Sequence, residues 1–153
     1  MQIFVSRLSM GAAALLLAAV ARADPPMPVF FVTLQGDNAV AQEPAGTVWP
    51  AGQGMTYDSV SPDGGLVLAT SSAEGRVYAF DARSGKSLGT VTVGKRPKGV
   101  KISPSGRVAI VANEGAGTIS LLDTGALKVT RTIPVGKMPH NTAFSPDSRW
   151  AYV

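Results

Sequence analysis

Short apolar runs alternate with turn residues along most of this chain, and residues 97–136 show the pattern in full. Four runs of five to eight residues are separated by glycine, proline, aspartate or asparagine: GVKIS, RVAIVAN, GTISLLD and KVTRTIPV. Runs of this length, rich in β-branched residues, are typical of strands, and none has the 3.6-residue apolar period of a helix. We therefore expect four consecutive antiparallel strands with apolar or small residues on both faces.

The same unit recurs at a fixed interval. Three Ser-Pro phrases, at residues 61–64, 103–106 and 145–148, begin 42 residues apart, and Val91 and Ile133 keep the same step. Each phrase suits a type I turn with proline in second place. A repeat of roughly 40–45 residues is the length of one propeller blade. The pattern predicts an all-β fold, a partial β-propeller of four-stranded antiparallel blades.

The repeat divides the chain after residue 23 into blade segments 29–51, 54–95, 96–137 and 138–153. The first segment is degenerate, because Val40 precedes its counterpart Val77 by only 37 residues. The segments predict three, four, four and two strands, or about three and a quarter blades.

The last strand, within RWAYV, has no third strand in the sequence to pair with it. We expect the chain to be an N-terminal fragment of a longer propeller, about 300–350 residues long if seven blades close the ring. Open strand edges and apolar faces favour association. Alone, the chain is therefore expected to be oligomeric, aggregated or partly unfolded.

Residues 1–23 have the features of a signal peptide. Arg7 precedes a short apolar stretch rich in small residues, and Ala21-Arg22-Ala23 fits an A-x-A cleavage site. We expect export to the periplasm or beyond, with no integral membrane span after cleavage.

The composition of the chain excludes several kinds of site. The chain has no cysteine, which removes disulfides, thiolate metal sites and a cysteine nucleophile. Its net charge is +4, and Arg7 and Arg22 would leave with the signal peptide. The remaining balance gives no reason to expect nucleic acid as a partner.

The third repeat resembles the YVTN-type β-propeller family. The phrases VAN at 111–113, TISLLD at 118–123, IPVG at 133–136 and AFSPD at 143–147 match that family's repeat. The resemblance implies a propeller of usually seven blades. It also implies relatives that include periplasmic propellers associated with quinone-dependent alcohol oxidation, haem d1 proteins and surface-layer proteins, among which the fold alone does not choose.

In such blades the loops entering the innermost strands share one face with the loops joining strands two and three. We call this the channel face, and expect any ligand there. Its candidate binding residues are Lys95, Arg96, Lys98, Lys137, His140, Asn141, Glu74, Asn113 and Glu114.

The candidates allow functional and structural interpretations. Lys95, Arg96 and Lys98, with Lys137 at the next repeat of the Lys95 position, could form an anion site or a solvated loop. His140 could ligate a metal or haem, or bond a loop carbonyl; no other histidine or carboxylate cluster lies at ligand spacing.

Two enzyme interpretations rest on weaker patterns. Residues 79–89, AFDARSGKSLG, resemble the Ala-x-Asp-x-x-Thr-Gly-Lys phrase of quinoprotein propellers, but Gly89 replaces the tryptophan that locks one blade to the next. Glu74, Asn113, Glu114 and Asn141 could serve a calcium-dependent hydrolase, although no nucleophile motif is present.

The sequence favours an exported, non-enzymatic binding or scaffold module for a protein partner or small anionic ligand. That interpretation includes no cofactor, no metal site and no catalytic residue. The alternative is a cofactor-bearing or hydrolytic propeller enzyme of the haem d1, quinoprotein or calcium-dependent lactonase kind.

Overall fold

The computed structural model describes residues 28–153, so the expected signal peptide lies outside the described residues. Within that range the chain forms only strands, turns and loops. The strands are β1 (Phe30–Leu34), β2 (Ala39–Glu43), β3 (Thr47–Pro50), β4 (Met55–Val60), β5 (Leu66–Ser71), β6 (Arg76–Asp81), β7 (Ser87–Thr92), β8 (Pro97–Ile102), β9 (Val108–Asn113), β10 (Thr118–Asp123), β11 (Lys128–Pro134), β12 (Ala143–Phe144) and β13 (Ala151–Tyr152).

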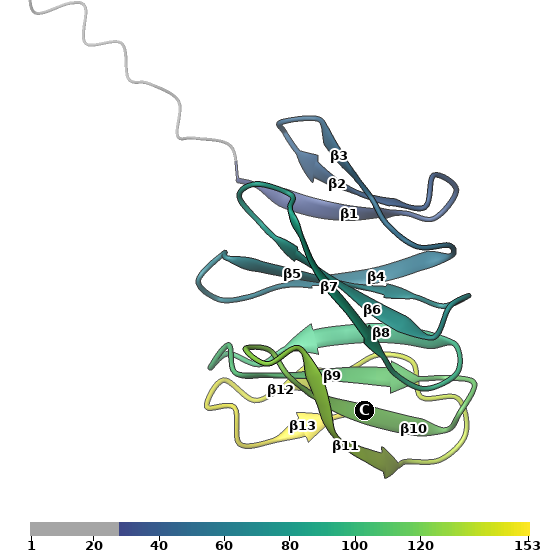
Figure 1. Cartoon of the computed structure of the whole chain (residues 1–153). Coiled ribbons are helices and arrows are strands. Elements are labelled where there is room, and N and C mark those ends of the chain that lie inside the picture. The colour runs from purple at the N-terminus through teal and green to yellow at the C-terminus, as the bar shows by residue number, and fades with distance from the viewer. Residues whose placement is uncertain (1–27) are drawn as a thin grey trace, which may run out of the picture.

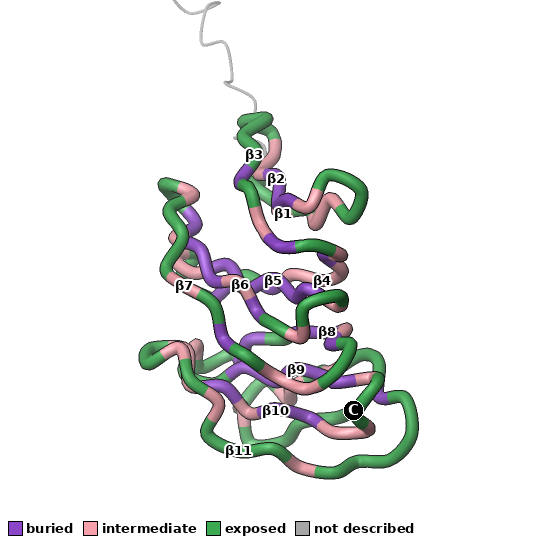
Figure 2. Tube along the Cα trace, turned by 45° about the vertical axis from the view of Figure 1, so that its right-hand side comes forward, coloured by how far each residue is buried: buried purple, intermediate pink, exposed green. Residues whose placement is uncertain are grey.

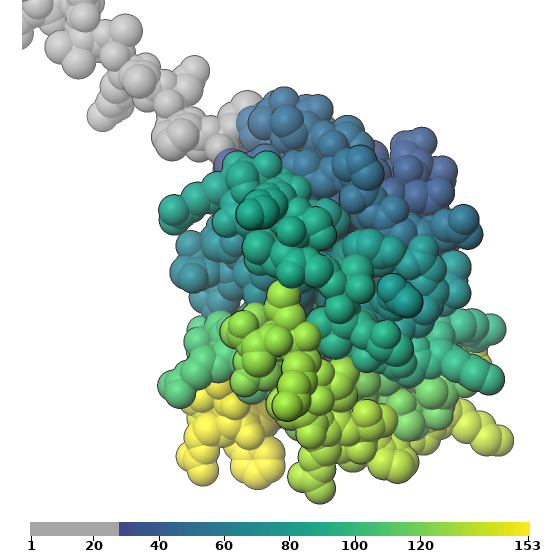
Figure 3. Space-filling view, viewed as in Figure 1, coloured from purple at the N-terminus to yellow at the C-terminus, as the bar shows by residue number. Residues whose placement is uncertain are grey.

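The strands form four antiparallel sheets in chain order: β1–β3, β4–β7, β8–β11 and β12–β13. We call them the first to fourth sheets. They stack face to face from the N-terminal sheet to the C-terminal strands (Figure 1), and on the face drawn in the space-filling view successive sheets lie against one another (Figure 3). This arrangement confirms the expected all-β fold of consecutive meander sheets, as in a partial β-propeller.

The strand registers confirm the repeat equivalences. Val40 pairs with Trp49 in the first sheet, and Val77 pairs with Val91 in the second. Ile119 pairs with Ile133 in the third sheet. The first sheet therefore contains the counterparts of the second, third and fourth strands of the complete sheets.

Buried apolar residues form two cores, one between the first and second sheets and one between the second and third. Figure 2 shows the buried positions along the trace of these sheets. Trp49, Met55 and Phe80 belong to the core between the first and second sheets. Leu68 and Leu122 belong to the core between the second and third sheets. Burial on both faces explains why these strands are continuously apolar or small rather than strictly alternating.

The three Ser-Pro phrases form the expected turns between first and second strands. The backbone N–H of Gly64 bonds the Ser61 carbonyl at 2.9 Å, and Gly106 bonds Ser103 in the same way at 2.8 Å. Ser148 takes the place of these glycines in the fourth sheet, with a φ of 61°.

Threonine hydroxyl groups connect the first and second sheets to the innermost strand of the sheet that follows. Thr33 Oγ1 donates to the Thr56 carbonyl at 3.0 Å, and Thr70 Oγ1 donates to the Lys98 carbonyl at 2.8 Å. These bonds fix β4 against the first sheet and β8 against the second. Both inner strands thereby present their N-terminal ends to the channel face.

A tryptophan packs between the first two sheets. Trp49 on β3 lies 5.4 Å from Phe31 and 5.5 Å from Phe80, measured between ring centroids. Its indole also covers Gly85 in the turn between β6 and β7, where a Cβ atom would lie 2.6 Å from Trp49 Cδ1. Trp49 thus joins the first sheet to the second, and the residue at its place in the second sheet, by register, is Val91.

No helix among residues 28–153 has the length and apolar character required to cross a membrane.

Candidate functional site

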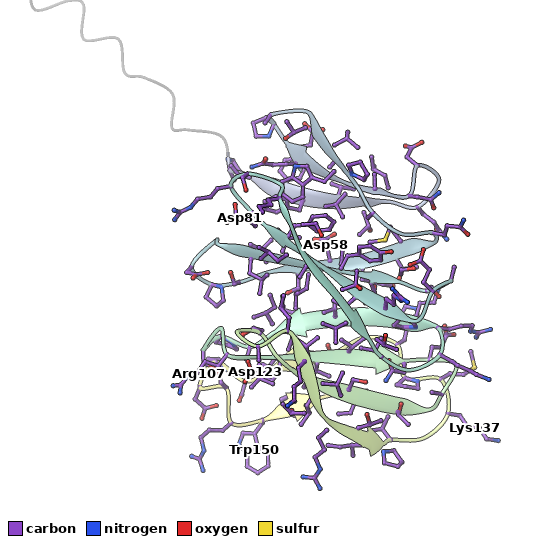
Figure 4. All side chains as sticks on the ribbon, in the orientation of Figure 1. Asp58, Asp81, Arg107, Asp123, Lys137 and Trp150 are labelled. Atoms are coloured by element: carbon purple, nitrogen blue, oxygen red, sulfur yellow. The ribbon has the colours of Figure 1, made fainter. Side chains whose placement is uncertain are left out.

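The channel face collects two sets of loops, as expected. Residues 35–38, 72–75 and 114–117 join second and third strands of the repeat, and residues 51–54, 93–96 and 135–142 enter inner strands. The turns around 61–65 and 103–107 lie on the opposite side, which we call the turn face. Figure 4 shows the separation, with Lys137 on one side and Arg107 and Asp123 on the other.

A cavity of about 440 Å³ opens on the channel face where the first three sheets meet. Its only charged lining residues are Arg96 and Lys98; the lining comprises Gln35, Gly54, Thr56, Ser72, Ala73, Arg96 and Lys98. The lining thus carries two positive charges and otherwise neutral polar or small groups.

The backbone fixes both cationic residues. Arg96 has a φ of 48°, and its carbonyl accepts the N–H of Glu114 at 3.1 Å. Arg96 Nη2 also lies 3.6 Å from Glu114 Oε1. The Arg96 side chain is 62% exposed and that of Glu114 only 10%, so the pair leaves the guanidinium accessible. Lys98 lies in the irregular stretch where β8 shifts register against β9.

Three other candidates line a separate cavity of about 420 Å³. Lys137, His140 and Asn141 contribute to it, together with Met138 and Val153. The His140 ring meets the Tyr57 ring edge to face at 5.5 Å. The His140 carbonyl accepts the N–H of Gly99 at 2.8 Å. Lys137 and Glu114 both line a further hollow, while exposed Lys95 lines neither the Arg96 cavity nor the His140 cavity.

Asn113 and Glu74 form internal contacts. Asn113 is fully buried; its Nδ2 donates to Thr118 Oγ1 and Ser120 Oγ, and its Oδ1 accepts the N–H of Gly94 at 3.0 Å. Glu74 Oε2 accepts the Tyr78 hydroxyl at 2.6 Å, and Oε1 accepts a backbone N–H. The Tyr78 hydrogen bond lowers the pKa of Glu74 and raises that of Tyr78.

Asp58 is a partly buried acid that sequence analysis did not select. It lies on inner strand β4, and burial raises the pKa of its carboxyl. The backbone N–H of Thr33 and the charge of Lys101 oppose this effect. Comparison of the repeats does not point to this acid, because the residues 42 and 84 positions after it are Val100 and Thr142.

We expect Asp58→Asn to stabilise the fold at neutral pH. A raised pKa in the folded state means that ionisation of Asp58 favours unfolding. The gain should be present above the folded-state pKa and should vanish as pH falls below the ordinary value of 3.8. Urea unfolding at several pH values measures it.

Asp63→Asn is the control with the opposite sign, because hydrogen bonds lower the pKa of Asp63. Its substitution should reduce stability at neutral pH. A stability loss at pH 7 in Asp58→Asn would contradict the assignment.

No group of three or more histidine, cysteine or acidic side chains within residues 28–153 is arranged to hold a metal ion.

Comparisons with solved structures define the class of protein. The chain resembles Kuenenia stuttgartiensis hydrazine synthase with a TM-score of 0.74 and 25% identity over 79% of this chain. It also resembles the dihydro-heme d1 dehydrogenase NirN, solved in complex with DHE, with a TM-score of 0.63 and 27% identity over 74% of this chain. Both neighbours have β-propeller folds, so the chain has the fold of a partial β-propeller.

The likeness covers only part of each neighbour: 37% of the hydrazine synthase chain and 26% of the NirN chain. No family model matches the sequence, and no curated protein matches it either. The propeller fold is therefore established, while membership of the YVTN family stays a prediction.

Proposed function

We propose that this chain belongs to an exported β-propeller that binds a small anionic ligand at its channel face through Arg96 and Lys98. The observation that carries the proposal is the cavity at the meeting point of three sheets, where these two cations are the only charged lining residues. Glu114 neutralises part of the Arg96 charge. Lys98 has no such partner within 4 Å among residues 28–153, so a net positive charge remains for a ligand.

The neutral lining supports the same ligand class. Ser72 and Gln35 offer hydroxyl and amide groups that can donate to carboxylate or phosphate oxygens. The inferred export rests on the signal-peptide pattern of residues 1–23.

The test uses citrate and inorganic phosphate as probes in calorimetric titrations of the full chain. Affinity should fall several-fold between 20 and 200 mM salt, because the Debye length shrinks to about 10 Å near 0.1 M. Lys98→Glu should weaken binding at least tenfold, since a charge-assisted hydrogen bond becomes a repulsion.

Lys86→Glu is the matched control. It makes the same charge change at an exposed site in the turn between β6 and β7, on the other face. Salt-independent binding, or equal losses in Lys98→Glu and Lys86→Glu, would refute the channel-face site. Far-UV circular dichroism checks that both variants are folded.

A second proposal is that the chain forms part of a cofactor-bearing propeller enzyme. It is supported by the two structural neighbours, both named as enzymes, one of them in complex with DHE. Visible absorbance and elemental analysis of the purified full chain test it. A chromophore or stoichiometric metal that co-purifies would favour this second proposal over the first.

A further inference from the structure

A second cleft lies on the turn face, between the second and third sheets. Its volume is about 620 Å³, and three charged side chains line it: Asp63, Arg107 and Asp123. The rest of the lining consists of Ser61, Pro62, Gly65, Leu66, Ser105, Gly106, Thr124 and Gly125. Arg107 and Asp123 lie close together on this side, away from Lys137 (Figure 4).

The preceding interface, between the first and second sheets, has two side-chain contacts to the turn that follows β6. There, Gln42 Nε2 donates to the Ala82 carbonyl at 3.5 Å, and Trp49 covers Gly85. In the next interface the equivalents of Gln42 and Trp49 by strand register are Ala79 and Val91.

Ala79 and Val91 are smaller, and alanine has no polar group to donate. Thr124, the counterpart of Ala82, lies on the wall of the cleft.

The turns hold both acids in fixed orientations. Asp123 Oδ1 accepts the N–H groups of Gly125 at 3.0 Å and Ala126 at 2.8 Å. Asp63 Oδ1 accepts the N–H of Gly65 at 3.0 Å and the Ser61 hydroxyl. Each carboxylate therefore uses one oxygen for its own turn. The hydrogen bond from Ser61 lowers the pKa of Asp63, which keeps it ionised at neutral pH.

Arg107 supplies the opposite charge. Within residues 28–153 it has no ion-pair partner within 4 Å, and its side chain is exposed. Pro62 and Leu66 add apolar surface to the same lining. The cleft thus combines two anions, one cation and an apolar wall, with a net charge of −1 from its lining side chains.

We infer that this cleft binds a basic amino acid. The ligand's cationic groups would contact the carboxylates of Asp63 and Asp123, and its carboxylate would contact the Arg107 guanidinium. Its aliphatic stem would lie against Pro62 and Leu66. A basic amino acid carries one net positive charge, which complements the lining.

Calorimetric titration with L-arginine tests this inference on the full chain. Asp123→Asn keeps Oδ1 for the turn but removes the charge, so it should weaken L-arginine binding about tenfold while leaving the fold intact. Asp81→Asn is the matched control. Asp81 Oδ1 makes the equivalent turn bonds in the second sheet, outside the cleft, and its substitution should leave affinity within about twofold.

Agmatine, which lacks the carboxylate of L-arginine, tests the role of Arg107. Arg107→Gln should weaken L-arginine binding severalfold and leave agmatine binding unchanged or stronger. No saturable L-arginine binding, or equal losses in Asp123→Asn and Asp81→Asn, would overturn the inference. Lys98→Glu should not alter L-arginine binding, so this result is separable from the channel-face test.

Discussion

Gly85→Ala should destabilise the fold by about 2–4 kcal/mol, through two effects at one position. Gly85 has a φ of 70°, which costs an L-residue about 1 kcal/mol or more. The new methyl group would also overlap the Trp49 indole, lying 2.6 Å from Cδ1 and in contact with Nε1. Overpacking of this kind typically costs about 1–3 kcal/mol. Urea denaturation of the full chain measures the sum.

Gly64→Ala measures the free-energy cost of a positive φ without any steric overlap. Gly64 has a φ of 69°, and a Cβ atom there would meet no heavy atom within 4 Å. We expect a loss of about 1 kcal/mol for this variant. Equal losses for the two variants would show that Trp49 does not constrain Gly85.

A double variant tests the contact directly. Trp49→Val introduces the residue that occupies the equivalent position, Val91, in the second sheet. It should remove the overlap, so the losses from Trp49→Val and Gly85→Ala should sum to more than the loss in the double variant.

The strands and turns could be predicted because their signals are local and repeated. The Ser-Pro phrases specify turns through residues adjacent in sequence, and Gly64 and Gly106 occupy left-handed positions in them. The 42-residue interval then aligns each strand with its counterpart, and the registers at Val77 and Ile119 agree with it.

The same interval was a poor guide to side-chain environments. Lys95 and Lys137 hold equivalent positions in the repeat. Lys137 lines the cavity around His140 and a further hollow, whereas Lys95 lines neither the cavity around Arg96 nor the one around His140. Asp58 was missed because its counterparts are not acidic. Contacts between sheets depend on residues that differ from one repeat to the next, and a repeat comparison removes those differences.

The turn-face cleft illustrates this limit. Its lining combines Asp63 from the turn of the second sheet with Arg107 and Asp123 from the third sheet, and these residues do not hold equivalent positions in the repeat. Only the three-dimensional register shows that Val91 takes the place of Trp49 in the next interface, where Leu127 packs against the core.

Asn113→Ala should destabilise the fold by about 3 kcal/mol. Asn113 is fully buried and links the loop before β8 to strand β10 through Gly94, Thr118 and Ser120. Alanine removes three hydrogen bonds, each with a net value of about 1 kcal/mol. It also leaves the Gly94 N–H without its acceptor, and an unpaired donor adds to the loss.

Asn141→Ala separates this structural role from ligand binding. Asn141 is exposed on the same channel face, so its substitution should change stability by no more than about 0.5 kcal/mol. Chemical denaturation and citrate titration are measured for both variants. Because Asn113 positions the loop that carries Arg96 and leads into β8 with Lys98, Asn113→Ala should lower both the unfolding midpoint and citrate affinity. A loss of citrate affinity with an unchanged midpoint would instead make Asn113 a direct ligand contact, contrary to its burial and its three internal partners.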